Sequence, residues 1–190
     1  MGVGTFVVLA ILVIVAIYGI LIYNGLVAVK HNVDKAWSNI DVLLRQRHDE
    51  LPKLVETCKQ YMKYEQDTLA RVIAARQSVA AAQGAGDIKA LGQAETALRA
   101  GLGQLFALAE AYPDLKANDT FKHLQARISE LENGIADRRE FYNESVNINN
   151  VRIEQFPDVL LAGVARARPR ELLQFAEEEK KDVDVKALFG

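Results

Sequence analysis

The chain has 190 residues, half of them hydrophobic, and its 23 Lys and Arg side chains nearly balance its 25 Asp and Glu side chains, for a net charge of −2. A chain of this length accommodates one domain with a short appendage. The charge balance argues against a nucleic-acid partner, because a phosphate-binding surface needs a local excess of Lys and Arg.

The first segment of the chain is strongly apolar. No charged side chain occurs from Met1 to Val29, and the segment is rich in Val, Ile and Leu. A membrane-spanning helix needs about 20 such residues at a rise of about 1.5 Å each. A cleaved secretory signal would show a basic start, a shorter apolar core and a small-residue cleavage site, and these features are not visible. Residues 1–29 are therefore predicted to form an uncleaved transmembrane anchor.

Behind the anchor, seam residues recur at alternating spacings of three and four from Val33 to Val79, which is typical of a long helix with coiled-coil-like packing. Pro52 falls inside this stripe without changing its phase. It predicts either a kink in one helix or a separation into two. The stretch QGAGD predicts the end of the helical segment, and its aspartate, Asp87, is suited to cap the next helix.

Two further stripes run from Ile88 to Tyr112 and from Phe121 to Tyr142. Between them, Pro113 biases the preceding residue away from helical dihedral angles, and Asn118 or Asp119 can cap a new helix. A connection this short joins antiparallel neighbours. No stretch alternates with period two over a strand length. The sequence therefore predicts an all-α fold, in which the transmembrane helix continues into an up-and-down antiparallel bundle of three to four long helices.

Four blocks of the sequence carry a family resemblance: YNGLV, AWSNIDVLLRQRHDELPKLVETCKQY, LFALAEAYPDLKANDTFKHLQ, and FYNESV followed by FP. In these blocks, which extend over about residues 20 to 160, the chain resembles the LemA family of bacterial membrane proteins. The resemblance implies a short amino-terminal anchor, an all-helical bundle and no established catalytic residues. The chain departs from the family at Ile148-Asn149, where Tyr-Asn is more usual, and in a less aromatic tail.

On this basis we expect three parts in a single-pass protein of the bacterial inner membrane. They are a transmembrane anchor at 1–29, a LemA-like helical bundle at 30–157, and a C-terminal tail with a short helix at 158–190. The short helix is expected in ELLQFAEEEKK.

The residue types that support catalysis or metal binding do not cluster in the sequence. His31, His48 and His123 lie on separate segments without metal-ligand spacing. The lone cysteine, Cys58, fits a helix core position. We therefore predict no catalytic residue, no metal site and no cofactor, with an unrecognised hydrolase as the weakest alternative.

Four charged residues fall on the seams: Arg47, Glu65, Glu95 and Arg138. A turn at 114–119 would place Glu95 nearly opposite Arg138 on the neighbouring antiparallel helix. Such an interhelical pair would set register more than stability, because desolvation offsets much of the attraction. In the alternative interpretation both side chains reach outward from the edge of the bundle.

The stretch ARARPRELL carries the most suggestive run of charge. Arg166, Arg168 and Arg170 are predicted to contact anionic lipid headgroups. The alternative is a solvated linker. The Asn-rich stretch NESVNINN has two interpretations as well, a polar seam inside the bundle or an exposed helix end.

The helix lengths predict an uncovered apolar face. The second stripe can cover only the later part of the first, and the third stripe outruns its partners. A long apolar stripe does not normally face water, so the tail, a fold-back at Pro52 or another subunit must cover it. Two staggered patches fit a head-to-tail homo-oligomer. The predicted oligomer or partner face consists of Val33, Trp37, Ile40, Leu44, Tyr142, Val146, Ile148 and Phe156.

Two functions follow from these features. The first is a non-enzymatic, membrane-anchored helical scaffold that self-assembles in the lipid bilayer and organises or shapes it. The second is a monomeric adaptor that binds a helix of another envelope protein through the same face. Lys30, Lys35, Arg45 and Arg47 follow the anchor closely and no basic residue precedes it, which favours the cytoplasmic side for the bundle. An anchor that behaves as an uncleaved signal would instead export it.

Overall fold

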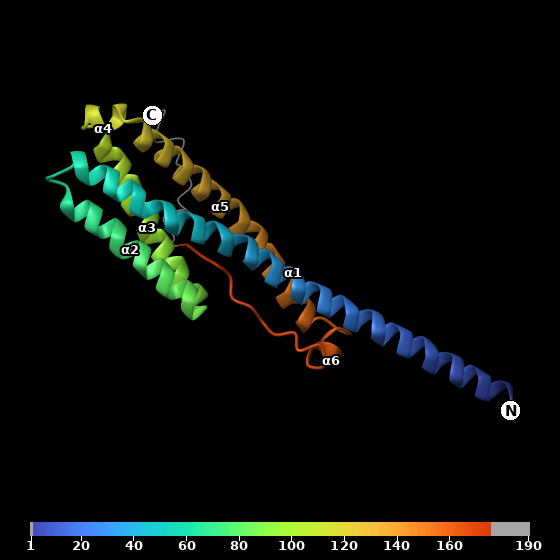
Figure 1. Ribbon diagram of the computed structural model, residues 1–190. Helices are drawn as coiled ribbons and strands as arrows, with labels where there is room; N and C mark the ends of the chain where they lie inside the picture. The colour runs from blue at the N-terminus through green and yellow to red at the C-terminus, as the bar shows by residue number, and fades with distance from the viewer. Residues whose placement is uncertain (1, 176–190) are drawn as a thin grey trace, which may run out of the picture. The chain divides into compact units, whose positions relative to one another are not determined.

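The computed structural model describes residues 2–175 (Figure 1). Six helices occur in this range: α1 (Val3–Tyr61), α2 (Gln66–Ala85), α3 (Ile88–Ala109), α4 (Pro113–Ala117), α5 (Asp119–Glu154) and α6 (Val159–Ala162). The described residues contain no strand, and the predicted all-α fold is confirmed.

The chain divides into two compact units. Within the described residues, the anchor unit comprises residues 2–40 and 138–172, and the bundle unit comprises residues 41–137 and 173–175. The helices α1 and α5 each contribute residues to both units. The short helix predicted in ELLQFAEEEKK lies mostly outside the described residues, and residues 171–175 are not helical.

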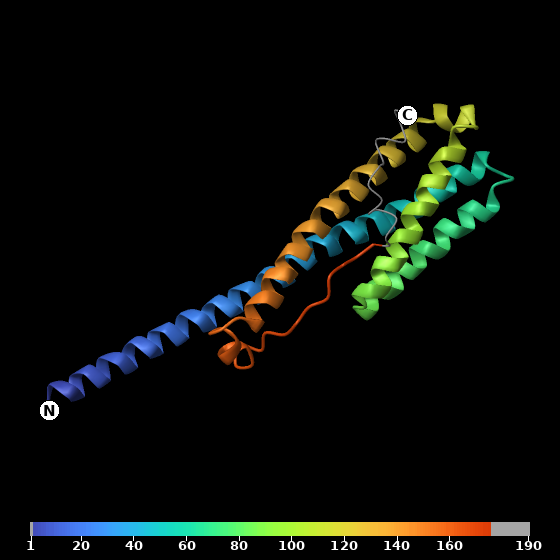
Figure 2. The same ribbon diagram turned by 180° about the vertical axis from the view of Figure 1, so that it is seen from behind.

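The first part of α1 is the candidate membrane span, long and apolar enough to cross a bilayer. The side chains from Val3 to Tyr18 are all exposed, and no other element of the anchor unit lies beside them (Figures 1 and 2). Ile22 is the first buried residue of α1, and Leu26 is the next. The surroundings of α1 therefore change near Ile22.

Pro52 does not divide α1, which continues to Tyr61. Proline has no backbone N–H, so the carbonyl of His48, four residues earlier, loses its helical partner. The Arg76 side chain of α2 replaces that partner, because its Nε donates to the His48 carbonyl oxygen at 2.9 Å. Its Nη2 also lies 2.7 Å from Nε2 of the His48 ring. A neighbouring helix thus satisfies the group that Pro52 leaves unpaired.

The chain reverses direction at Met62–Glu65, a stretch without a turn signal in its sequence (Figure 1). This stretch contains neither glycine nor proline, and Tyr61, Glu65 and Thr68 keep the spacing of the stripe across it. Residues 33 to 79 were expected to form one seam, but they belong to two helices, α1 and α2. Periodicity does not distinguish a helix that continues from one that folds back in the same phase.

The bundle unit consists of four helical segments and the short α4. The segments come from α1, α2, α3 and α5, and each has a buried apolar face. Two of the predicted caps are confirmed: the Asp87 side chain accepts from the N–H of Ala90 at 2.8 Å, and the Asn118 side chain accepts from the N–H of Phe121 at 3.0 Å. These caps fix where α3 and α5 begin.

We predict that Arg76 and Pro52 are energetically coupled. The change Arg76→Leu should lower the free energy of unfolding by about 1–3 kcal/mol, because it leaves a partly buried carbonyl without a donor. In a Pro52→Ala background the restored N–H of residue 52 can bond to the His48 carbonyl, so Arg76→Leu should cost less there. Chemical denaturation of the four chains in mild detergent, followed by circular dichroism, measures the coupling; an equal cost in both backgrounds would contradict it.

Candidate functional site

A cluster of ions lies inside the bundle unit, where two of its members are buried with the apolar core. Arg47 of α1 is 1% exposed and donates hydrogen bonds to Glu95 of α3 and to Glu132 of α5. Arg99, also on α3, forms an ion pair with the second Glu132 oxygen at 3.2 Å. We call Arg47, Glu95, Glu132 and Arg99 the ion cluster. It connects three helices through one guanidinium group.

The pKa values in the ion cluster follow from burial and from the number of carboxylates around one cation. Burial alone would lower the pKa of Arg47, but Glu95 and Glu132 outweigh burial and the pKa is raised. Burial raises the pKa of Glu95, and the negative charge of Glu132 adds to this, although Arg47 and Arg99 oppose it. Among the described residues, Nε of Arg47 and Oε2 of Glu95 are buried without a hydrogen-bond partner. An incompletely satisfied buried cluster fixes register more than it adds stability.

The sequence prediction for Glu95 needs a correction. Its partner in the structure is Arg47, whereas Arg138 is exposed. The prediction centred the turn on residues 114–119, but α3 already ends at Ala109 and α5 begins at Asp119. Glu95 lies fourteen residues before Ala109, and the residue fourteen after Asp119 is Asn133. Glu132, beside Asn133, is therefore at the level of Glu95.

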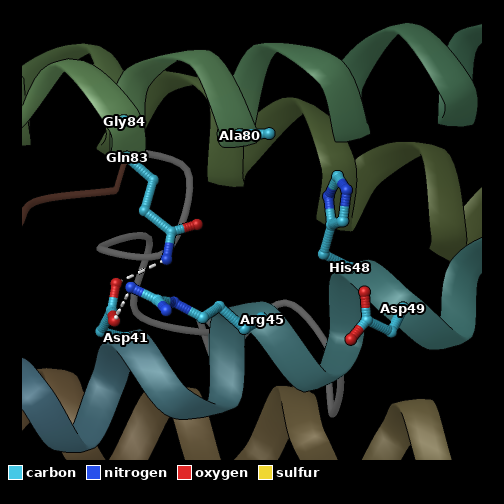
Figure 3. Close-up of a pocket in the computed structure, with 7 residues that line it drawn as sticks. All are labelled: Asp41, Arg45, His48, Asp49, Ala80, Gln83 and Gly84. Atoms are coloured by element: carbon cyan, nitrogen blue, oxygen red, sulfur yellow. Dashed lines mark hydrogen bonds and ion pairs between the residues drawn. The ribbon is translucent and has the colours of Figure 1, made fainter.

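An open groove between α1 and α2 is lined by several ionisable side chains (Figure 3). It has a volume of about 370 Å³ and is lined by Asp41, Arg45, His48, Asp49, Ala80, Gln83 and Gly84. The Asp41 carboxylate accepts from Gln83 at 2.6 Å and pairs with Arg45 at 2.7 Å. Burial and the neighbouring Arg76 lower the pKa of His48. Asp41 and His48 therefore already have partners, and the arrangement does not present a nucleophile activated by a base.

Other candidates for chemistry in the described residues are also accounted for by packing. Cys58 is fully buried, and burial raises the pKa of its thiol to about 12, so it is a core residue. Within residues 2–175, no three His, Cys, Asp or Glu side chains stand together as a metal site would require.

The predicted oligomer or partner face is largely covered within the chain. Five of its residues are buried: Val33, Ile40, Leu44, Tyr142 and Val146. Trp37 is half-buried, and its ring lies 5.6 Å from that of Tyr142. Only Ile148 and Phe156 of this face are exposed.

The reason is the length of α5, which continues to Glu154 and packs against α1 within the anchor unit. Two stripes that looked unmatched in the sequence meet each other at Trp37 and Tyr142. The expectation that this face is free for a partner is therefore corrected.

The Asn-rich stretch of α5 holds the chain that follows α6. Nδ2 of Asn149 donates to the carbonyl of Arg168 at 2.9 Å. The Asn150 side chain bonds to both backbone groups of Arg170, at 2.8 and 2.9 Å, and the Tyr142 hydroxyl donates to the carbonyl of Glu171 at 3.0 Å. This segment therefore runs antiparallel to α5.

The three arginines predicted to contact lipid headgroups lie on this segment. Arg166, Arg168 and Arg170 are all exposed, whereas Ala165, which precedes them, and Ala167, between the first two, are buried. Arg170 pairs with Asp34 at 3.0 Å. Contact of these arginines with lipid stays a prediction.

Sequence reasoning missed Glu132 and left NESVNINN undecided. Glu132 follows Ile128 by four residues and so lies on the edge of the apolar stripe, which was an available signal. The hydrogen-bond partners of Asn149 and Asn150 could not be predicted from the sequence. They are backbone groups of a segment that has no periodic pattern.

We predict that the single change Arg47→Met is more damaging than removal of the pair. Arg47→Met leaves the buried Glu95 carboxylate without its hydrogen-bonded cation, whereas Glu132 keeps its ion pair with Arg99, and should lower the free energy of unfolding by about 3–5 kcal/mol. Adding Glu95→Leu should recover most of this loss, because it removes the buried charge. Denaturation of both variants in mild detergent measures the difference, and a double variant at least as unstable as Arg47→Met would contradict the prediction.

Arg47→Met should also change how stability depends on pH. The pKa of Glu95 is already raised, and loss of Arg47 removes an opposing cation. A carboxyl group with a raised pKa in the folded state stabilises the fold at low pH and loses this contribution as pH rises through that pKa. The unfolding free energy of Arg47→Met should therefore fall from pH 5 to pH 8. Arg45→Met, at a side chain that is 73% exposed, is the matched control. It keeps Arg47 beside Glu95, so its stability should fall less steeply over this range than that of Arg47→Met, as in the unaltered chain.

Comparison with known proteins agrees with this description. The family model of the LemA family matches residues 36–187. Magnetosome proteins MamQ 1 and MamQ 2 of Paramagnetospirillum magneticum are each 28% identical to the chain over 192 residues, which covers 88% of this chain and 71% of theirs. Magnetosome protein MamQ of Magnetospirillum gryphiswaldense is 27% identical over 158 residues, or 71% of this chain and 58% of the relative. The chain belongs to the LemA family.

Proposed function

We propose that this protein is a non-enzymatic scaffold of the bacterial inner membrane, anchored by α1 and associating with copies of itself. The observation that carries the proposal is that the candidate span and the packed part of α1 belong to one uninterrupted helix. A flexible linker would let a domain move freely relative to its anchor. A continuous helix instead holds the residues that pack on α1 at a fixed distance from the candidate span. The relatives are named for the magnetosome and for no reaction, which supports a structural role.

The proposed contact between copies lies on the outer face of α5. Phe141, Ile148 and Val151 are 43–52% exposed, and their spacing of seven and three residues places them on one side of the helix. We call these three residues the α5 stripe. Most residues of the oligomer or partner face that the sequence predicted are buried within the chain. They are therefore not available for the two staggered contacts that would build a ring or a filament. One self-complementary stripe favours a two-fold pair.

The α5 stripe is smaller than the interfaces of stable soluble complexes. Anchoring compensates, because two chains confined to one membrane meet at a much higher effective concentration than in solution. The adaptor hypothesis is weaker, because Tyr142 packs against Trp37, a residue of the face that a partner helix would need.

Cross-linking through an introduced cysteine tests the proposed pair. Ile148→Cys should form a disulfide between two copies in membranes, because a two-fold contact of the stripe brings the two thiols together. The matched control is Asn147→Cys, which is also exposed but points about 100° away around the helix. Buried Cys58 will not compete, since its thiol has a pKa of about 12.

The expected product has twice the mass of the chain and becomes rare when the protein is diluted with lipid. Equal yields from Ile148→Cys and Asn147→Cys would contradict the proposed pair, and a product with a different protein would favour the adaptor.

We also propose that the part of the chain after the candidate span lies on the cytoplasmic side of the membrane. The basic residues that follow the anchor support this side, because cytoplasmic segments next to a span are enriched in Lys and Arg. Tyr64 is 94% exposed, so Tyr64→Cys offers a readily labelled thiol. A membrane-impermeant maleimide should label it only after spheroplasts are lysed. Labelling in intact spheroplasts would overturn the assignment, and the unaltered chain, with Cys58 buried, is the control.

A further inference from the structure

The turn that follows α5 exposes an unusual group of large apolar side chains. Phe156, Leu160 and Val164 are 80%, 68% and 67% exposed, and Val159 between them is also exposed. We call residues 156–164, which include α6, the apolar turn. These residues fall within one short turn, so their exposure differs from that of scattered surface residues, which is ordinary.

The apolar turn packs directly against the anchor helix. Ile22 and Leu26 of α1 form a buried cluster with Ile153 at the end of α5 and with Ala162, Ala165 and Ala167. Arg152 of α5 approaches Gly25 so closely that a Cβ atom there would lie 2.8 Å from its Nη2. Both views show α6 beside α1 (Figures 1 and 2). The turn therefore has a defined level along α1, that of residues 22 to 26.

This level coincides with the end of the membrane span. The helix from Val3 to Ile22 is about 30 Å long at about 1.5 Å per residue, which matches the hydrocarbon core of a bilayer. The exposed side chains of α1 up to Leu21 are suited to lipid, and Ile22 is the first residue that the rest of the anchor unit covers. Val29 is the last residue of the charge-free run, and Lys30 follows it. The apolar turn lies between these two limits, where acyl chains give way to headgroups.

The charges around the apolar turn fit the same location. Asp158 is the one charged residue between positions 155 and 165, and its carboxylate accepts a 2.7 Å hydrogen bond from Nε of Arg152. Exposed Arg166 and Arg168 follow the turn, whereas Glu154 precedes it. The one charge of the turn is therefore paired, and arginines follow the turn, which suits a segment that inserts its apolar side chains below the headgroups.

We infer that the apolar turn is a second membrane contact, in which Phe156, Leu160 and Val164 enter the interface of the leaflet where α1 ends. The anchor unit then meets the bilayer both through α1 and through the turn, and α1 cannot rotate about its axis without withdrawing these side chains from lipid. The inference rests on the span of α1 in a bilayer and not on self-association.

Spin labels at exposed positions test this contact in the full chain. The sites are Leu160→Cys in the turn, Val13→Cys in the span and Tyr64→Cys as an exposed reference in the bundle unit, with Cys58 buried and unreactive. The labelled chains are placed in nanodiscs at one chain per disc, so that failure to self-associate does not affect the result. Relaxation by oxygen, which concentrates in lipid, is compared with relaxation by a water-soluble nickel complex.

We expect the ratio of oxygen to nickel accessibility at Leu160 to be several-fold higher than at Tyr64 and closer to that at Val13. A ratio at Leu160 equal to that at Tyr64 would overturn the inference. So would protection of Leu160 from both reagents that appears only when several chains share a disc, because it would show that another copy covers the turn. Labels at exposed positions leave the buried cluster intact, which the cooperative melting of each labelled chain checks.

Discussion

The structure depends on one helix, α1, whose candidate membrane span continues into a protein interior without a change of helical geometry. Up to Leu21, every large apolar side chain of α1 is exposed, and from Ile22 onward α1 has a buried face. The backbone hydrogen bonds of a helix are internal, so the same conformation is stable in both surroundings and only the side chains must change. The sequence makes this change in steps, from an all-round apolar surface to an apolar stripe and then to a stripe that contains Arg47.

The polar groups inside the bundle unit follow from packing several helices around this one. Pro52 leaves a carbonyl of α1 unpaired, and Arg76 of α2 satisfies it. Arg47 places a guanidinium in the core, and Glu95 and Glu132 come from two other helices to meet it. Each arrangement works only when the helices lie in one register, so these residues select among packings that the apolar stripes alone would allow. Such a role fits a protein whose proposed function is structural, because a unique arrangement of helices matters more to it than an accessible reactive group.

The sequence was sufficient for features that depend on local chemistry. The charge-free run up to Val29 indicated an apolar helix long enough to span a bilayer, and the capping side chains of Asp87 and Asn118 marked where helices begin. The hairpin at Met62–Glu65 was not predictable in this way, because its residues carry no turn signal and the apolar phase continues across it. The α5 residue level with Glu95 also depended on the exact ends of α3 and α5, which place Glu132 there and not Arg138, six residues later. The partner of Glu95, Arg47, comes from α1. The cover over Trp37 required knowing that α5 extends to Glu154, well beyond the last residue of its apolar stripe.

The most direct test of this account is cysteine-scanning accessibility along α1 from Tyr18 to Lys35 in lipid bilayers. Every position up to Leu21 should report a lipid environment. From Ile22 onward, accessibility should acquire a helical period in which Ile22, Leu26, Val33 and Ala36 are protected, because the anchor unit covers one face of the helix. Water accessibility on all sides of the helix beyond Ile22 would contradict the account, since it would mean that α5 and the apolar turn do not pack on α1.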